Sequence, residues 1–177
     1  MRAQSAVCLS YSVMLSTDFD MSQNGVLPGI VGRNDAVDDE RFAVHVAWFN
    51  TNESGVVHKI QTKSEHPAAS DAATTPPAEK PAPNFEFEAK TFDLPKGRWA
   101  RINQELVLNK PGASDGVLRI WVDGRLALER TDMRFRTDPG TTVAGVTAAA
   151  HLMNQDISGP APVESNIWFT PYELRWQ

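Results

Sequence analysis

Residues 117–129 read VLRIWVDGRLALE, and this stretch decides the fold class. Buried-type and outward-type residues alternate from Val117 to Val122, which is the period of a strand with one buried face. Asp123-Gly124 then interrupts the alternation before a second run, Leu126 to Glu129. Because Asp-Gly between two alternating runs is the strongest short-range hairpin signal, the stretch predicts two antiparallel strands joined by a tight turn.

The same period of two recurs along the whole chain. Near the N-terminus the apolar residues of one predicted face are Val7, Leu9, Tyr11, Val13 and Leu15. Further strands are predicted over residues 42–49, 56–62, 85–89, 99–108, 143–153 and 167–176, and no amphipathic helix or internal repeat interrupts them. Many short strands separated by turn residues are typical of a sandwich or jelly roll. The predicted fold class is therefore all-β, with two packed antiparallel sheets.

Composition predicts one soluble globular domain spanning residues 1–177. Hydrophobic residues make up 41% and charged residues 22%, and the length leaves room for a sizeable core. Residues 64–83, SEHPAASDAATTPPAEKPAP, are rich in proline and alanine and lack large apolar side chains. Such a segment buries too little surface to offset its ordering entropy, so we expect a mobile loop at the rim of the domain.

Charge and hydropathy exclude several kinds of partner. The net charge is -5 and no basic stripe is present, so no nucleic-acid partner is expected. No apolar run approaches the roughly 20 residues that span a bilayer. The first residues alternate instead of forming the apolar core of a signal peptide. We therefore expect no membrane association and no signal peptide in this chain, which leaves a cytoplasmic, extracellular or virion-associated location open.

The sequence offers little for a metal or a cofactor, and none is expected. Cys8 is the single cysteine, which rules out an intrachain disulfide and a cysteine metal cluster. An acidic run, Asp35, Asp38, Asp39 and Glu40, lacks the spacing of a calcium-binding EF-hand loop. We interpret this run as a solvated set of charges.

Three segments together resemble the polysaccharide lyases of family 14. Residues 9–32, LSYSVMLSTDFDMSQNGVLPGIVG, are similar to the family opening Y-x-V-x-F…D-F-D…G-K-L-P-G-L-x-G-G. Residues 97–125, GRWARINQELVLNKPGASDGVLRIWVDGR, resemble the block G-x-W…LN-x-P-G…DG-x-x-x-V-W-V-D-G. The third segment is the closing strand pair, residues 145–176. The resemblance implies a concanavalin-like β-jelly roll that acts on, or binds, an acidic polysaccharide such as alginate or glucuronan.

The resemblance also implies that the usual catalytic set is altered. The family keeps Lys before Leu-Pro-Gly, where this chain has Val26. The family strand F-S-x-R-x-M-W has Ser and Arg where this chain has Ala43 and His45. A polyuronate lyase that works by β-elimination needs a base for the C5 proton, an acid for the leaving oxygen and donors for the carboxylate. Other residues would have to supply these groups.

Two histidines are the candidate catalytic residues. His45 alternates with Phe42, Val44 and Val46, so it should point away from the core into a groove. His151 lies on the late strand, and imidazoles titrate near neutral pH. Candidate substrate-binding residues, chosen by the same alternation, are Lys59, Gln61, Arg101, Asn103 and Trp121.

Trp121 is the best candidate for a platform on which a sugar ring stacks, because it alternates with core residues. Trp48 and Trp176 fit the core periodicity better, and Leu27-Pro28-Gly29 is interpreted as a rigid corner. Two alternatives to a lyase stay open. One is a glycan-binding jelly roll without catalysis, and the other is a structural or assembly protein such as a virus or phage surface component. A homo-oligomer or larger assembly is compatible with each.

Overall fold

The computed structural model describes residues 5–21, 24–48, 54–61, 86–152 and 165–177. The segment predicted to be a mobile loop, 64–83, lies outside the described residues. Sheet A contains β1 (Ala6–Leu15), β6 (Trp99–Val107), β7 (Gly116–Val122), β8 (Arg125–Met133), β11 (Ile167–Phe169) and β12 (Glu173–Trp176). Sheet B contains β2 (Gly25–Asn34), β3 (Val37–Trp48), β4 (Ser54–Gln61), β5 (Glu86–Phe92), β9 (Thr142–Thr147) and β10 (His151–Leu152).

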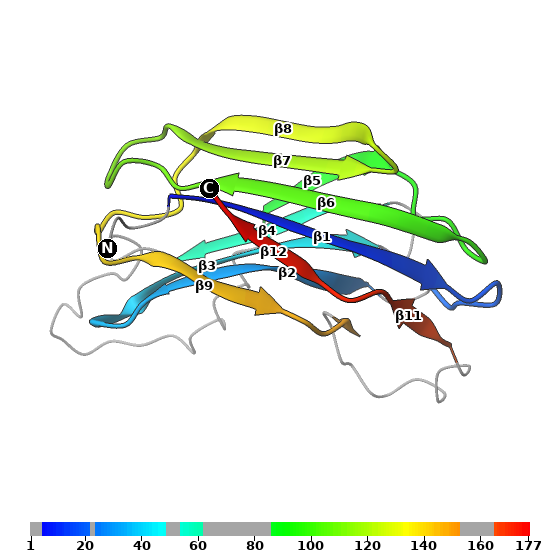
Figure 1. Ribbon diagram of the computed structural model, residues 1–177. Coiled ribbons are helices and arrows are strands. Elements are labelled where there is room, and N and C mark those ends of the chain that lie inside the picture. The colour runs from blue at the N-terminus through cyan, green and yellow to red at the C-terminus, as the bar shows by residue number, and fades with distance from the viewer. Residues whose placement is uncertain (1–4, 22–23, 49–53, 62–85, 153–164) are drawn as a thin grey trace, which may run out of the picture.

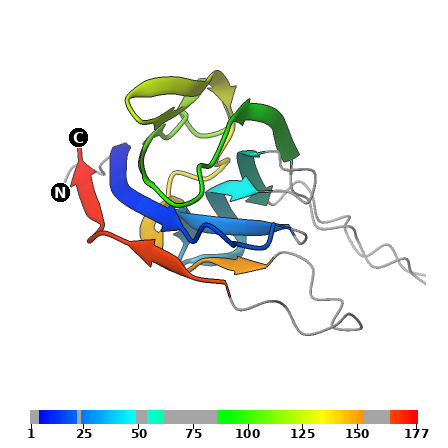
Figure 2. The same ribbon diagram turned by 90° about the vertical axis from the view of Figure 1, so that its right-hand side faces the viewer.

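The two sheets stack face to face, with sheet A in front of sheet B in Figure 1 and the layers seen from the side in Figure 2. Sheet A runs β11-β1-β6-β7-β8 with β12 also paired to β1, and sheet B runs β10-β2-β3-β4-β5 with β9 also paired to β2. All these strand pairs are antiparallel, and the described residues include no helix. The predicted all-β architecture is confirmed.

The core lies between the sheets, where the alternation of the sequence placed it. The five apolar residues on the inward face of β1 are all at most 3% exposed, and Trp48 of β3 is 1% exposed. Trp176 was expected in the core and is 41% exposed, so that prediction was wrong. Trp176 is the last residue of β12, which pairs only with β1 and therefore lies at an edge of sheet A. At this edge the side chain is only partly covered.

Hairpin and strand boundaries correct part of the sequence reading. Asp123 and Gly124 both have positive φ, as the predicted tight hairpin between β7 and β8 requires. Leu27-Pro28-Gly29 is not a corner but a bulge inside β2, where the pairing with β3 shifts between Val26 and Gly29. Pairing of β2 on both sides overrides the turn signal of Pro-Gly, and a bulge is where a sheet accepts proline.

Asn109 ties the turn after β6 to the segment that follows β8. Its side-chain amide donates to the carbonyls of Lys110, Ala113 and Arg136, at 2.7, 2.9 and 2.8 Å. Its carbonyl oxygen accepts from the backbone N–H groups of Phe135 and Arg136, at 2.8 and 3.0 Å. The residue is fully buried. One side chain therefore forms hydrogen bonds with five backbone groups that no strand pairs, and its two N–H hydrogens are shared among three carbonyls.

Glu40 corrects the reading of the acidic run as solvated. It lies in β3, is 1% exposed, and accepts hydrogen bonds from Thr137, Asp138 and Thr141. Burial alone would raise the pKa of this carboxyl, but the hydrogen bonds hold the pKa below its usual value. Sequence spacing could not reveal this, because the donors come from a loop about a hundred residues away.

We expect Asn109→Ala to lower the free energy of unfolding by about 3 kcal/mol, since it leaves several buried backbone groups without partners. Urea unfolding of the purified protein measures the change. Asn103→Ala is the matched control, because Asn103 is only half-buried and accepts one hydrogen bond, from Ser10. Equal losses in the two variants would contradict this role for Asn109.

Candidate functional site

The candidate site is the outer face of sheet B, meaning the side of that sheet that points away from the core. On β3 the core receives Phe42, Val44 and Val46. Alternation therefore turns the intervening residues to the outer face, and they are Arg41, Ala43, His45 and Ala47. The pattern of the sequence predicted this orientation for His45.

Strand register brings β2 residues beside these positions, because paired residues of antiparallel strands share a face. The pairs between β2 and β3 are Val26 with Ala47, Gly29 with His45, Val31 with Ala43, and Arg33 with Arg41. On the other side of β2, His151 pairs with Val26. The two histidines therefore reach the same face from different strands.

His45 and His151 lie in contact. Their ring centroids are 6.2 Å apart and the rings meet edge to face. His45 is 6% exposed, whereas His151 is exposed. The structure thus places one buried and one solvent-facing imidazole side by side, which is a geometry in which one ring can accept a proton while the other exchanges protons with solvent.

The surroundings of His45 set its protonation. Its Nδ1 lies 2.9 Å from the carbonyl oxygen of Leu27, which can only accept, so Nδ1 carries the hydrogen and donates it. Burial lowers the pKa of His45, the Leu27 hydrogen bond raises it, and the charge of His151 lowers it further, with a net decrease. At neutral pH the ring is therefore uncharged, and its lone pair is on Nε2.

Gly29 gives the ring of His45 the space for this arrangement. A Cβ placed on Gly29 would lie 2.7 Å from Nδ1 of His45 and 2.0 Å from the carbonyl oxygen of Val44. Both distances are too short for real atoms. Only glycine allows the backbone of β2 to approach the histidine this closely.

The β2 bulge that supplies the Leu27 carbonyl is held from the opposite sheet. Tyr11 of β1 donates its hydroxyl to the carbonyl oxygen of Pro28 at 2.9 Å, and Gln104 of β6 donates its amide to the same oxygen at 3.1 Å. Both side chains are buried, and burial raises the pKa of Tyr11, so its hydroxyl stays protonated. The amide oxygen of Gln104 has no partner. Two residues of sheet A thus fix the backbone beside His45.

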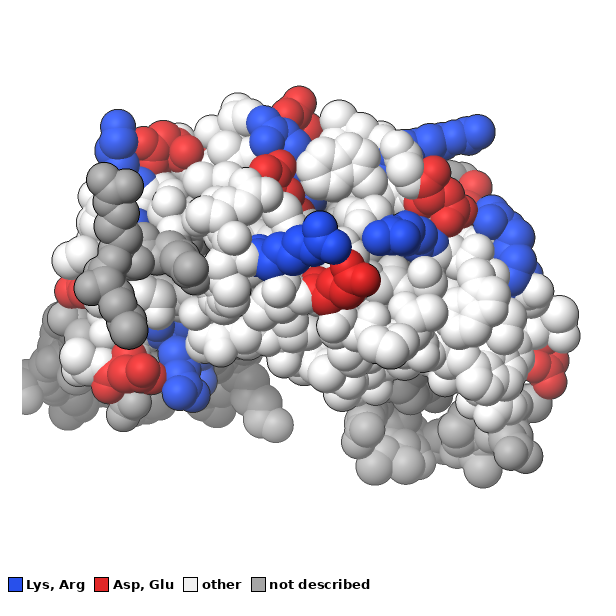
Figure 3. All heavy atoms as spheres, in the orientation of Figure 1, with Lys and Arg blue, Asp and Glu red and all other residues white. Residues whose placement is uncertain are grey.

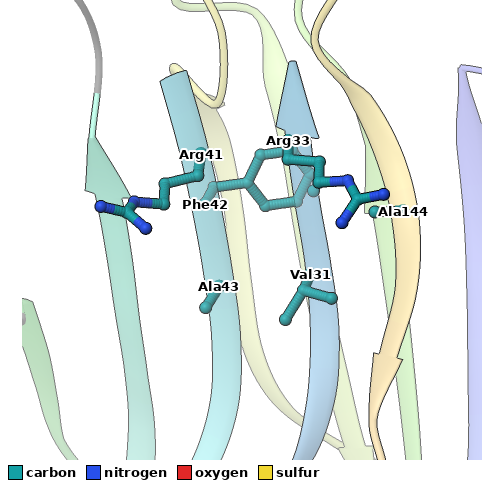
Figure 4. A pocket seen from close by; sticks show the side chains of 7 residues that line it. Val31, Arg33, Arg41, Phe42, Ala43 and Ala144 are labelled. Carbon is teal, nitrogen blue, oxygen red and sulfur yellow. The ribbon is translucent and has the colours of Figure 1, made fainter. Parts of the chain in front are cut away.

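Two arginines form the other end of the same face. Arg33 and Arg41 flank a pocket of about 440 Å³ whose lining also includes Val31, Ala43 and Ala144. Figure 4 shows the two guanidinium groups leaning apart, Arg33 toward β9 and Arg41 toward β4. Arg33 contacts Asp35 at 2.7 Å, but both side chains are largely exposed, so the ion pair is weak and easily exchanged.

Arg41 and His45 are four residue steps apart on β3, which corresponds to about 13 Å along the strand. Sequence reasoning missed both arginines. The signal was available for Arg41, because it continues the alternation of Ala43 and His45 by one step. Arg33 carried no such signal, since the strand that holds it was not predicted.

Lys59 and Gln61, which were predicted to bind substrate, belong to β4. Register pairs Lys59 with Ala43 and Gln61 with Arg41. Both predicted residues therefore occupy positions in the same part of sheet B as the pocket, and their role in binding stays a prediction.

Arg101, Asn103 and Trp121 are not brought to this site. Arg101 and Asn103 lie on β6 and Trp121 lies on β7, and these strands belong to sheet A. Their neighbours Ile102, in the core, and Gln104 point inward, so these three point outward on the opposite side of the molecule. The alternation in the sequence distinguished inward-pointing from outward-pointing residues. It could not show to which of the two sheets, and so to which outer face, each strand belongs.

Among the described residues, no group of three or more His, Cys, Asp or Glu side chains is arranged to hold a metal ion. Within the same residues, no helix has the length and apolar character needed to cross a membrane.

Comparison with known proteins identifies the family. The model of polysaccharide lyase family 14 matches residues 1–170. The chain belongs to this family. No match is found among curated proteins.

Solved structures share the fold of this family-14 protein. The PL-14 alginate lyase from Aplysia kurodai has a TM-score of 0.76 and 16% identity, with 100% of this chain and 72% of the other covered. The alginate lyase vAL-1 from Chlorella virus has a TM-score of 0.68 and 15% identity, covering 98% and 72%. The endo-β-1,4-glucuronan lyase from Trichoderma reesei has a TM-score of 0.61 and 13% identity, covering 96% and 68%. These likenesses confirm the jelly-roll fold.

We expect Tyr11→Phe and Gln104→Leu to be strongly non-additive. Each single change leaves the Pro28 carbonyl one donor and should cost about 1 kcal/mol or less, but the double change leaves it unsatisfied. The double variant should therefore lose at least about 1 kcal/mol more than the sum of the singles, measured by urea unfolding.

Tyr172→Phe provides the control for this cycle. The ring of Tyr172 meets that of Tyr11 edge to face with centroids 5.5 Å apart, whereas the hydrogen bonds to Pro28 come from Tyr11 and Gln104. Combined with Gln104→Leu, it should give additive losses. Additive losses with Tyr11→Phe as well would show that the two donors do not share the carbonyl.

Proposed function

We propose that this family-14 protein binds an acidic polysaccharide of the polyuronate class on the outer face of sheet B and cleaves it by β-elimination. The observation that carries the proposal is the state of His45. The Leu27 carbonyl holds the hydrogen on Nδ1, burial keeps the ring uncharged, and His151 lies beside it. An uncharged imidazole held in one tautomer is a suitable general base at neutral pH.

The reaction assigns one step to each histidine. Nε2 of His45 takes the C5 proton of a uronate residue, and the electron pair of that C–H bond forms the C4=C5 double bond. The C4–O bond to the neighbouring sugar breaks at the same time. His151 gives a proton to the departing oxygen. The products are an unsaturated uronate at one new end and a free hydroxyl at the other, so atoms and charge balance.

Binding is assigned to the cationic end of the face. Arg33 and Arg41 provide guanidinium groups that match carboxylates, and Lys59 and Gln61 are the proposed further contacts. A linear polyuronate carries a carboxylate on every sugar. A chain held by the arginines would extend along β3 toward His45, about 13 Å away.

Binding without cleavage is the second candidate, and the residues beside His45 favour it. Val26 is 2% exposed and Ala43 is a methyl group, so neither can donate, accept or titrate. They stand where the resemblance implies Lys and Ser. The two histidines would have to do the chemistry alone, without a dedicated carboxylate donor next to the base. A structural or assembly role is the outcome if neither binding nor cleavage is found.

Cleavage is tested with alginate, glucuronan and a neutral glucan, by following the ultraviolet absorbance of the unsaturated product. We expect product from a polyuronate only. His45→Gln should lower the rate by about 100-fold or more, because glutamine cannot take the proton. The rate should fall at low pH with a midpoint below the ordinary pKa of histidine, since the pKa of His45 is lowered and only the neutral ring acts.

The same variant separates the two candidate functions. His45→Gln should still retain the polyuronate in affinity gels, because the arginine end is untouched. If the unaltered protein gives no product yet is retarded by polyuronates, the second candidate holds. A rate unchanged in His45→Gln would remove this residue from the mechanism.

Loss of both pocket arginines should weaken binding. We expect Arg33→Ala with Arg41→Ala to lower affinity for a polyuronate about tenfold at low salt, because charge-assisted hydrogen bonds are lost. The difference should shrink as salt is added. Affinity electrophoresis measures it. Arg130→Ala with Arg175→Ala is the matched control, because it also removes two arginines, which pair with Asp132 and Glu173 on sheet A. Equal effects of the two changes would mean that binding follows total charge and not this pocket.

A further inference from the structure

The outer face of sheet A, meaning the side of that sheet turned away from the core, carries exposed aromatic side chains. Four large hydrophobic side chains are exposed among the described residues, and three of them are tryptophans. Trp99 is 46% exposed and Trp168 is 44% exposed, and both belong to this face. Single exposed hydrophobic residues are ordinary on a protein surface, whereas exposed apolar side chains that lie together mark an interaction site.

Trp99 and Trp168 stand on either side of one residue. Met14 of β1 pairs with Trp168 of β11 on one side and with Trp99 of β6 on the other. Paired residues share a face, so the three side chains form a row across the strands. The two tryptophans are two strand spacings apart, about 10 Å. The row is a flat apolar ledge edged by two indoles.

Polar groups continue this face next to the ledge. Arg101 follows Trp99 by two residues and pairs with Ser12, and Asn103 pairs with Ser10 and accepts its hydroxyl hydrogen at 2.7 Å. Asn103 also pairs with Trp121 of β7, which lies on the same face. Tryptophans therefore lie on both sides of a polar centre.

Arg101 differs from the other arginines of this face. Arg119 is held by Glu105 at 2.8 Å and by Glu129 at 2.7 Å, and Arg175 is held by Glu173 at 3.1 Å. No carboxylate of the described residues forms an ion pair with the exposed guanidinium of Arg101. Arg101 is thus a cation beside two exposed indoles, with its charge available to an anion.

We infer that the outer face of sheet A is a second carbohydrate-binding surface, on which Trp99 and Trp168 stack against sugar rings and Arg101 pairs with a uronate carboxylate. The choice of an acidic polysaccharide as occupant rests on the proposed function. The surface itself is separate from the outer face of sheet B, because the whole core lies between the two. Figure 3 shows this face, with charged side chains scattered among a broad area of uncharged ones.

The chemistry of this face fits a sugar chain better than a protein partner. A pyranose ring presents a face of C–H groups that packs on an aromatic plane, and its rim carries hydroxyls that need donors and acceptors. The indoles supply the plane, and Asn103, Ser12 and Arg101 supply the polar contacts. A protein interface of this size would bring a larger aliphatic centre, whereas here Met14 is the one aliphatic side chain of the Trp99–Trp168 row.

The test compares the loss of Trp99 and Trp168 together with the loss of Trp176. Trp99→Ala with Trp168→Ala should lower affinity for a long polyuronate about tenfold, because two stacking contacts are lost. Trp176→Ala is the matched control, because Trp176 is 41% exposed but pairs with the core residue Val7 and so lies off this face. Affinity electrophoresis of both variants, made in the His45→Gln background to prevent cleavage, gives the comparison. Arg101→Gln should weaken binding to the polyuronate and leave any binding to a neutral glucan unchanged.

The results distinguish this surface from the site on sheet B. Cleavage of a short uronate oligosaccharide should be unaffected by Trp99→Ala with Trp168→Ala, because the oligosaccharide cannot reach both faces. Polymer affinity that depends on Trp99 and Trp168, with no cleavage and no dependence on Arg33 and Arg41, would support this surface and overturn the proposed function. Polymer affinity equal to that of Trp176→Ala would overturn the surface. So would loss of a dimer on sizing without loss of polymer affinity, because the ledge would then bind a second copy of the chain.

Discussion

One backbone carbonyl oxygen links the two sheets of this protein and helps to position the candidate site. The carbonyl of Pro28 accepts hydrogen bonds from Tyr11 and Gln104, both of which cross the core from sheet A. A carbonyl that faces the core is stable there only while its hydrogen-bond donors are in place. The bulge at Leu27-Pro28 therefore has one conformation, and the Leu27 carbonyl points at His45 because of it. The orientation of a side chain on the outside of sheet B thus depends on residues of the opposite sheet.

The alternation of the sequence predicted more of the fold than of the site. It gave the inward faces of β1 and β3, because a strand with one buried face must place apolar residues at every second position. It missed β2, because Pro28 and Gly29 have the composition of a turn. Pairing on both sides of β2 made it a strand, and such long-range pairing leaves no local signal. The same limit explains Glu40, whose donors lie far away in the chain.

The site was half predictable for a related reason. His45 and His151 were expected on one face, and their rings are in contact. Arg101, Asn103 and Trp121 were correctly expected to point outward, yet they lie on sheet A. A period of two shows which residues of a strand point into the core and which point to solvent. A sandwich, however, has two solvent-facing surfaces, one on each sheet. Only the order of strands in each sheet, which depends on the whole chain, decides between them.

The residues that carry the chemistry and the residues that carry the fold are different sets in this protein. Val26, Ala43 and His45 point away from the packed layer between the sheets, whereas Tyr11, Asn109 and Phe135 hold that layer together. Substitution at the exposed positions of the outer face of sheet B, such as Arg33 and Arg41, therefore changes the folding energy little. Over generations such positions can drift to new reactivity, or to none, while the scaffold persists. A jelly roll of this kind can keep its fold after its original activity is lost, and can then acquire a different activity.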